Sequence, residues 1–170
     1  MKAILMSIRS THGCNVLNGI KKREIRKKFP KDYVGWIYLY ITKGKPYLSS
    51  NSFKYYVAEH YEKYMGNWNG KVVARFWCDK VDEFYDFDDD LCKQACLNRG
   101  EMLDYLGNKN GYAIHITKLK IFDKPKDISE FMKVSCKGCP FENTQTCHND
   151  TDGRYCKLTR APQSWCYVEV

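Results

Sequence analysis

A short stretch near the N-terminus carries basic and acidic side chains at a spacing suited to recognising an anion or a nucleobase. It covers residues 18–27 and reads NGIKKREIRK. If residues 23–27 are extended, Lys22, Glu24 and Arg26 lie on one face, because side chains alternate along a strand. A carboxylate between two cations would be ionised and could orient a guanidinium toward an anion or a base edge. From the residues alone, an edge strand with ordinary surface ion pairs is the alternative.

A second group of residues that could do chemistry is a cluster of cysteines near the C-terminus. Four of the nine cysteines follow the pattern C-x₂-C-x₇-C-x₈-C, at Cys136, Cys139, Cys147 and Cys156. Four thiolates at such spacing can complete a tetrahedral shell around zinc. Few apolar residues lie between them, so residues 136–156 cannot form a core of their own. A structural zinc ion would hold this segment in a folded conformation. An iron–sulfur cluster and a loop with free or redox-active thiols are the alternatives.

Length and composition indicate one domain with a real core. The chain has 170 residues, of which 44% are hydrophobic and 15% aromatic. We therefore expect a single domain over residues 1–170, with residues 136–156 as a cysteine-rich insertion. The sequence has neither an apolar run of about 18 residues nor the pattern of a signal peptide. These features predict a cytoplasmic protein with reduced thiols and no membrane partner.

The charge is uneven along the chain. The formal net charge is +8. Residues 21–32 hold seven basic and two acidic side chains, whereas residues 79–90 hold seven acidic and one basic side chain. A basic patch attracts polyanions, and phosphate is the usual one in cells. A solvated basic surface with no partner is the alternative interpretation.

The elements that must position these residues alternate between strands and helices. β-Branched and aromatic runs predict strands at residues 2–8, 34–42, 71–78, 112–122 and 165–170, the fourth with a possible bulge. Apolar spacing predicts helices at residues 10–19, 53–64 and 91–106, the last with a break at Gly100. Aspartates at residues 86–90 suit a helix start. The fold class is therefore α+β, with five to six strands in a curved, mostly antiparallel sheet and two to three flanking helices.

This arrangement predicts where the charged motif lies. Ser7 ends the first strand and Lys43 follows the second, so both are expected at the rim of one pocket. Lys21, Glu24 and Arg26 are expected to converge on that pocket, with Lys21 free to bind a phosphate.

Two further residues have alternative interpretations. Trp165 could stack on a nucleobase, or it could be a core residue of the last strand. His115 alternates with isoleucines in its strand and faces either the cleft or solvent, and we assign it no catalytic role.

The sequence resembles the ASCH domains of the PUA-like superfamily. The stretch LMSIR at residues 5–9 is followed by LNGIKKREIR at residues 17–26, in which Gly19, Lys21, Glu24 and Arg26 match the family pattern Gly-x-Lys-x-x-Glu-x-Arg. Residues 38–44, 70–74, 106–113 and 161–167 resemble phage-encoded members in the same order. Ser10 departs from the pattern, which usually has proline there.

The resemblance implies a small PUA-like mixed β-barrel with a cleft lined by the Lys/Glu/Arg motif. In such families the cleft binds RNA or a nucleotide-like ligand. Together with Ser7 and Lys43 from the strand geometry and Trp165 from its capacity to stack, the candidate ligand-binding residues are Ser7, Arg9, Lys21, Glu24, Arg26, Lys43 and Trp165. A phage regulatory or anti-defence role is what the resemblance to phage members suggests.

One ASCH branch resembles an amidohydrolase of N4-acetylcytidine, so hydrolysis of a modified nucleobase is the alternative function. That branch has a threonine where Glu24 stands, and a carboxylate cannot replace the hydroxyl of a nucleophile. Glu83 is the candidate for the branch's distal glutamate. The sequence alone leaves open whether the protein is an enzyme.

Overall fold

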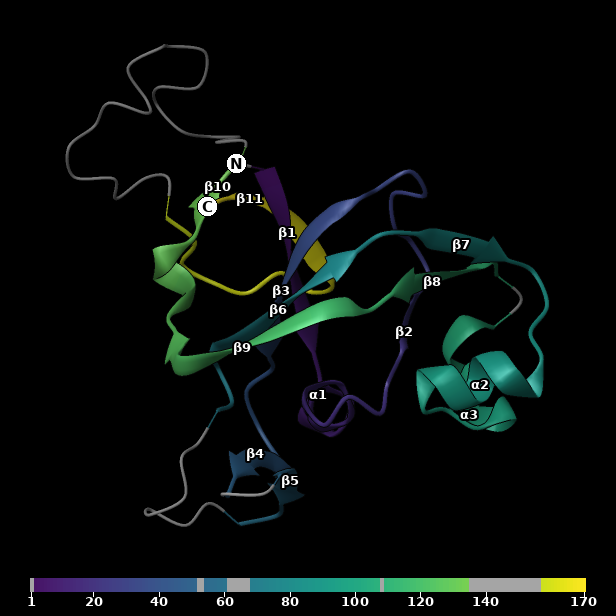
Figure 1. Cartoon of the computed structure of the whole chain (residues 1–170), viewed down its shortest axis with the longest axis horizontal. Helices are drawn as coiled ribbons and strands as arrows, with labels where there is room; N and C mark the ends of the chain where they lie inside the picture. Colours follow the sequence, from purple (N-terminus) through teal and green to yellow (C-terminus); the bar gives the residue numbers. More distant parts are fainter. Residues whose placement is uncertain (1, 52–53, 61–67, 108, 135–156) are drawn as a thin grey trace.

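A mixed six-stranded sheet forms the centre of the molecule. The computed structural model describes residues 2–51, 54–60, 68–107, 109–134 and 157–170. The strands of this sheet are β1 (Lys2–Ile8), β3 (Gly35–Ile41), β6 (Val72–Cys78), β9 (Thr117–Lys126), β10 (Met132–Lys133) and β11 (Trp165–Glu169). Their order is β10-β11-β1-β3-β6-β9, so β9 lies at one edge (Figure 1). β1 and β3 are parallel and every other neighbouring pair is antiparallel.

The central strands are apolar on both faces because both faces of the sheet are buried. On one face Ile4, Leu39 and Phe76 belong to the main core, to which helix α1 (Ser10–Leu17) contributes Val16. On the other face Leu5 and its neighbours form a smaller core. The second core is partly covered by the segment around the short 3₁₀ helix Ile128–Glu130.

Two smaller sheets flank the central one. β2 (Arg23–Arg26), β8 (Gly111–His115) and β7 (Val81–Phe84) form an antiparallel sheet in that order. Helices α2 (Asp89–Ala95) and α3 (Arg99–Leu106) pack against it through a third apolar cluster that includes Ile25 and Ala113. β4 (Tyr47–Ser50) pairs with β5 (Tyr55–Ala58) and both contact α1. The charged motif of β2 therefore lies between α1 and the α2–α3 pair.

The α+β class and the mostly antiparallel pairing are confirmed, as is the presence of three α-helices. The number of strands was underestimated, since the described residues form eleven strands. These strands make three sheets, and within the described part of the chain they form no closed barrel. The six-stranded sheet is the mostly antiparallel sheet that the sequence predicted.

The predicted helix over residues 53–64 is wrong for its described part. Tyr56 and Val57 lie in β5, while Phe53, Tyr61 and Tyr64 are outside the described residues. The segment forms a strand because its backbone pairs with β4. In addition, the Asn18 side chain accepts a hydrogen bond from the N–H of Tyr55 and donates one to the carbonyl of Tyr55. Aromatic and β-branched residues also favour strands.

Two boundaries were misplaced. The helix over residues 91–106 divides before Asn98, not at Gly100, which lies inside α3. Cys96 ends α2 in a left-handed conformation (φ 52°), and Asn98 begins α3 in a capping box with Glu101. The strand over residues 112–122 divides at Ile116 into β8 and β9, which belong to different sheets.

Two sequence predictions have different outcomes here. No helix in the described ranges is long and apolar enough to cross a membrane. Cys136, Cys139, Cys147 and Cys156 lie outside the described residues, so the cysteine-rich insertion over residues 136–156 stays a prediction.

Candidate functional site

Three charged side chains of the motif form a buried chain of ion pairs. Arg26 Nη2 lies 3.0 Å from Glu24 Oε1, and Lys21 Nζ lies 3.3 Å from Glu24 Oε2. Lys21 also donates a hydrogen bond of 2.5 Å to the carbonyl of Ala95, and Arg26 Nη2 donates one of 2.7 Å to the carbonyl of Ser7. Lys21, Glu24 and Arg26 are 2%, 6% and 9% exposed. We call these three residues the buried triad.

Local structure explains how the triad is assembled. Gly19 has a φ of +69°, which lets the chain turn sharply after α1 so that Lys21 N–H can bond to the carbonyl of Asn15. β2 then begins at Arg23 and pairs with β8, which places Glu24 opposite Ile114. Gly13 lets α1 approach β3, since a Cβ at that position would clash with the side chain of Ile41.

The electrostatics of the triad keep Glu24 ionised. Burial by itself raises the pKa of Glu24, but Lys21 and then Arg26 outweigh burial, so the pKa is lower than usual. His12 behaves in the opposite sense, because burial and the charge of Lys21 lower its pKa and favour the neutral ring. The lowered pKa values therefore favour an ionised Glu24 and a neutral His12 side by side in the site.

A cavity of about 560 Å³ opens beside the triad. Its volume falls in the range of small-molecule and cofactor sites. The end of β1, the start of α1, β2 and one side of α3 supply its walls. The lining side chains relevant here are those of Ser7, Arg9, His12, Lys21, Glu24, Arg26, Glu101, Asp104, Tyr105 and Gln163.

Five of the seven predicted ligand-binding residues line this cavity, and two do not. Ser7 and Arg9 join the triad there, while Lys43 is replaced by its neighbour Thr42. The stem of Lys43 lies beside Gly70 instead. The indole of Trp165 packs against Phe29 and donates a hydrogen bond to the carbonyl of Lys28. Trp165 is thus partly buried against the main core and does not line the cavity.

The structure corrects the expected role of Lys21. Its ammonium group is buried and is held by Glu24 and by the carbonyl of Ala95, so it is not free to bind a phosphate. Arg9, by contrast, is exposed at the edge of the cavity.

Sequence reasoning missed the residues that α1 and α3 contribute. His12 lies one turn from Arg9, and Glu101, Asp104 and Tyr105 come from one side of α3. The α3 residues lie about 80 residues from the motif in the sequence, so no local pattern connects them to it. The signal that could have placed α3 is the Asn98–Glu101 capping box, which fixes where the helix begins.

The cavity residues include most of the unsatisfied buried polar atoms in the described part of the chain. Four buried side-chain atoms there have no hydrogen-bond partner. Three of them belong to cavity residues: His12 Nδ1, Glu24 Oε2 and Arg26 Nε. Glu24 Oε2 has the ion pair to Lys21 but no hydrogen bond of good geometry. Buried polar groups in proteins are usually satisfied, so this concentration calls for an explanation.

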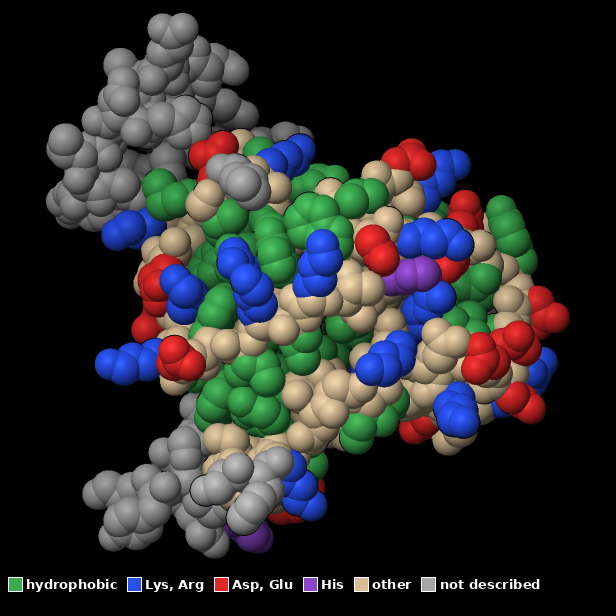
Figure 2. Space-filling model, viewed as in Figure 1, with side chains coloured by type: hydrophobic (Ala, Val, Ile, Leu, Met, Phe, Trp, Pro, Cys, Tyr) green, Lys and Arg blue, Asp and Glu red, His purple; other side chains and the backbone are tan. Residues whose placement is uncertain are grey.

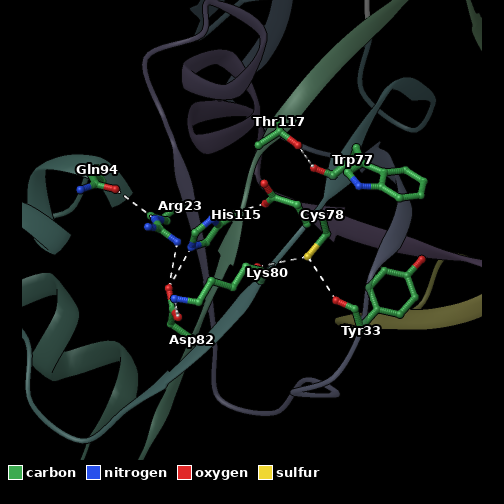
Figure 3. A network of polar contacts seen from close by, with 10 residues as sticks. Arg23, Tyr33, Trp77, Cys78, Lys80, Asp82, Gln94, His115 and Thr117 are labelled. Atoms are coloured by element: carbon green, nitrogen blue, oxygen red, sulfur yellow. Dashed lines mark hydrogen bonds and ion pairs between the residues drawn. The ribbon is translucent and has the colours of Figure 1, made fainter.

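A second cavity, of about 460 Å³, has a different character. It lies between β2, β7 and α2, and its charged lining is Arg23 with four aspartates, so it is unsuited to a phosphate. Figure 3 shows Asp82 where Arg23, Lys80 and His115 meet. Arg23 Nη1 lies 3.1 Å and His115 Nε2 2.8 Å from Asp82 Oδ2, and Gln94 accepts a further bond from Arg23. The polar groups of this cluster satisfy one another.

The candidate for the distal glutamate, Glu83, lies on β7 and does not line the triad cavity. Its Oε1 accepts hydrogen bonds from Asn110 and Tyr112. No group of three or more potential metal ligands is found among the described residues.

Fold and site together define a mixed α+β protein with a buried Lys–Glu–Arg cavity beside its central sheet. The sequence matches no protein-family model and no curated protein. The structure is similar to crystal structures of ASCH from Zymomonas mobilis. For one of these the TM-score is 0.58 at 13% identity, covering 98% of this chain and 87% of that chain. Two mutants of that protein give TM-scores of 0.57 at 13% identity, covering 98–99% of this chain and 88–91% of theirs. The chain therefore has the fold of these ASCH structures.

Proposed function

We propose that this protein is an RNA- or nucleotide-binding module that holds a nucleotide unit in the cavity beside the buried triad. The observation that carries the proposal is the concentration of unsatisfied buried polar atoms on His12, Glu24 and Arg26. Leaving a buried donor or acceptor without a partner costs about 1–3 kcal/mol. Because these atoms are buried in the ligand-free protein, small movements of their side chains toward the cavity would let a bound ligand recover that cost.

The chemistry of the three atoms favours a base edge over a bare phosphate. Arg26 Nε is a donor and Glu24 Oε2 is an acceptor, whereas His12 Nδ1 takes either role according to its tautomer. A phosphodiester presents only acceptors, so it would leave the carboxylate oxygen unmatched. Nucleobase edges present donors and acceptors side by side.

The rim of the cavity suits the rest of a nucleotide. Arg9 is exposed there and can reach the phosphate of the bound nucleotide. Tyr105 is 38% exposed and lines the cavity, so its ring is available for stacking on the base. In the proposal, the buried triad is thus the side of the cavity that contacts the base edge, and Lys21 is the counter-ion that holds Glu24 in place.

Amidohydrolysis, the alternative, gains no specific support from the described residues. The Ser7 hydroxyl donates a 2.6 Å hydrogen bond to the carbonyl of Pro162, and the Ser10 hydroxyl does the same to Pro46. Each of these hydrogen bonds goes to a backbone carbonyl and not to a histidine or carboxylate that could activate the hydroxyl as a nucleophile. A role in phage regulation or anti-defence stays a prediction.

Titration of the protein with a panel of nucleoside monophosphates and short RNAs tests the proposal. Arg26→Lys keeps the charge beside Glu24 but removes the Nε donor and the planar fork, so it should weaken binding by about 1–3 kcal/mol. Arg23→Lys is the matched control, because it makes the same change in the same strand at a residue that lines the other cavity. Arg23→Lys should bind like the wild type.

Two results would refute the proposal. One is the absence of saturable binding to any nucleotide or RNA by the wild type. The other is an equal loss of affinity in the two variants, which would mean that only general positive charge is involved. N4-acetylcytidine can be incubated with the protein alongside this panel. Chromatography of that sample would show deacetylation if the alternative function is correct.

A further inference from the structure

The face of the central sheet that holds the smaller core carries a second set of cations, packed among aromatic rings. Trp36 of β3 pairs with Trp77 of β6, and their rings meet edge to face at 5.3 Å between centroids. The Arg75 guanidinium lies 4.3 Å from the centroid of Trp36. From β9, Lys120 Nζ lies 5.9 Å from Trp36, and Lys118 Nζ lies 5.7 Å from Trp77. We call these five residues the aromatic–basic face.

An irregularity in β9 creates this arrangement. Thr117 pairs with Trp77 but Lys120 pairs with Arg75, so β9 has one residue more than β6 between the two pairs. Lys118 has a φ of +45° at this point. Because one extra residue exchanges the two faces of a strand, Leu119 packs against the main core while Lys120 joins Arg75 on the opposite face.

Within the described part of the chain, the three cations of this face contact aromatic rings and have no acidic partner. Within the described residues, Arg75, Lys118 and Lys120 form no ion pair with a carboxylate. The basic residues that do form one are Lys21, Arg23, Arg26, Lys71, Lys80, Arg99 and Lys126. The fourth unsatisfied buried atom of the described chain, Arg75 Nε, also belongs to the aromatic–basic face.

The surface around this face is accessible and basic. Lys118 and Lys120 are exposed, and Trp36 and Trp77 are partly buried. In Figure 2 basic side chains lie over the part of the molecule where Figure 1 draws β9, with hydrophobic surface between them. The neighbouring part of the same sheet face is closed by Phe131, which packs on Tyr38 at 5.0 Å between ring centroids.

We propose that the aromatic–basic face binds single-stranded nucleic acid. Phosphates would contact Lys118 and Lys120, and bases would stack on the exposed parts of Trp36 and Trp77. Cations without acidic partners next to aromatic rings match a polyanion that carries π faces, and this is the combination found in single-strand binding grooves. Lysines on an edge strand also discourage pairing between copies of a sheet, but that role does not require the tryptophan pair beside them.

This second surface is independent of the nucleotide cavity, so each can be tested with the other intact. Fluorescence anisotropy with labelled U₁₀ and dT₁₀ at several salt concentrations measures binding to the face. Removing two phosphate contacts by Lys118→Gln/Lys120→Gln should make the slope of log K against log salt shallower by about 1.4. Trp77→Leu should weaken binding roughly fivefold or more at every salt concentration by removing a stacking surface.

The matched control is Lys93→Gln/Lys109→Gln, which removes the same charge at two exposed positions away from the face. It should leave the salt slope near that of the wild type. Equal changes in slope for the two double variants would overturn the proposal, as would equal competition by a polyglutamate peptide, since either would indicate non-specific attraction. If only Arg26→Lys weakened binding of the oligonucleotides, the face proposal would fail while the cavity proposal stood. Circular dichroism of each variant establishes that it is folded.

Discussion

Replacing Glu24 by glutamine should strongly destabilise the folded protein. Glutamine keeps the size of the side chain but removes its charge, so Lys21 and Arg26 would be left as buried cations without a counter-charge. Lys21 is 2% exposed and Arg26 is 9% exposed, so water can compensate little of this loss. Breaking a buried pair by removing one partner costs about 3–5 kcal/mol. Domains are stable by only about 5–15 kcal/mol in total.

Thermal unfolding gives the expected size of this effect. For a domain of this length, each kcal/mol corresponds to about 2–4 °C in Tm, so Glu24→Gln should lower Tm by about 6–20 °C. Glu101→Gln is the matched control, because it makes the same chemical change on the wall of the same cavity at an exposed residue. Glutamine also serves at this position of a capping box, so the control should stay within about 2–4 °C of the wild type.

A double-mutant cycle with Lys21→Met checks that the loss comes from the ion pair. Removing the ammonium group along with the carboxylate takes away one of the two uncompensated charges, so the double variant should be more stable than the sum of the single effects predicts. A decrease in Tm of less than about 2 °C for Glu24→Gln would refute the reasoning, because it would mean that the triad is solvated.

Three further predictions concern other parts of the molecule. The pKa of His12 is lower in the folded protein than in the unfolded chain. The stability that the neutral ring contributes should therefore be present above pH 6.5 and decrease as the pH falls below that value. Between pH 7.5 and 5.5, Tm should decrease less steeply for His12→Gln than for the wild type. Asn98→Ala removes the cap of α3 and should lower the free energy of unfolding by about 1 kcal/mol, measured by urea denaturation; an unchanged midpoint would contradict the capping argument. For the cysteine segment we expect about one zinc per chain by elemental analysis after purification without added metal. Less than roughly a tenth of an equivalent of zinc, with no iron, would exclude the site formed by Cys136, Cys139, Cys147 and Cys156.

The parts of the fold that the sequence predicted well are those where burial determines the pattern. β1 and β3 are continuous apolar runs because both faces of the sheet are covered, and such runs are visible without knowledge of the partners. The β5 segment failed because its apolar spacing also fits a helix, and what decides its structure is pairing with β4 and hydrogen bonds from Asn18. That information lies in other segments of the chain.

The same distinction between local sequence and long-range packing applies to the site. The triad could be predicted because Lys21, Glu24 and Arg26 are close in sequence and the extended conformation of β2 brings the last two together. The role of Lys43 as a ligand contact was extrapolated from where a strand ends, and that of Trp165 from the stacking ability of its ring. Neither residue lines the cavity in the structure. The contribution of α3 depends on the tertiary packing of the α2–α3 pair, so it required the structure.

The energetics of the triad support the binding role that we propose for it. Apolar residues of similar volume often stabilise a protein as well as a buried ion pair does, or better, because burying charges costs several kcal/mol each. Lys21, Glu24 and Arg26 recover part of this cost from one another, yet Glu24 Oε2 and Arg26 Nε still have no hydrogen-bond partner among the described residues. The cluster around Asp82 shows that the same fold can satisfy a charged group fully, through Arg23, Lys80 and His115. Incomplete satisfaction at one cavity and complete satisfaction at the other is the difference expected if the first cavity is shaped to bind a polar ligand. The same comparison extends to Arg75, whose unsatisfied Nε lies on the face where we place single-stranded nucleic acid.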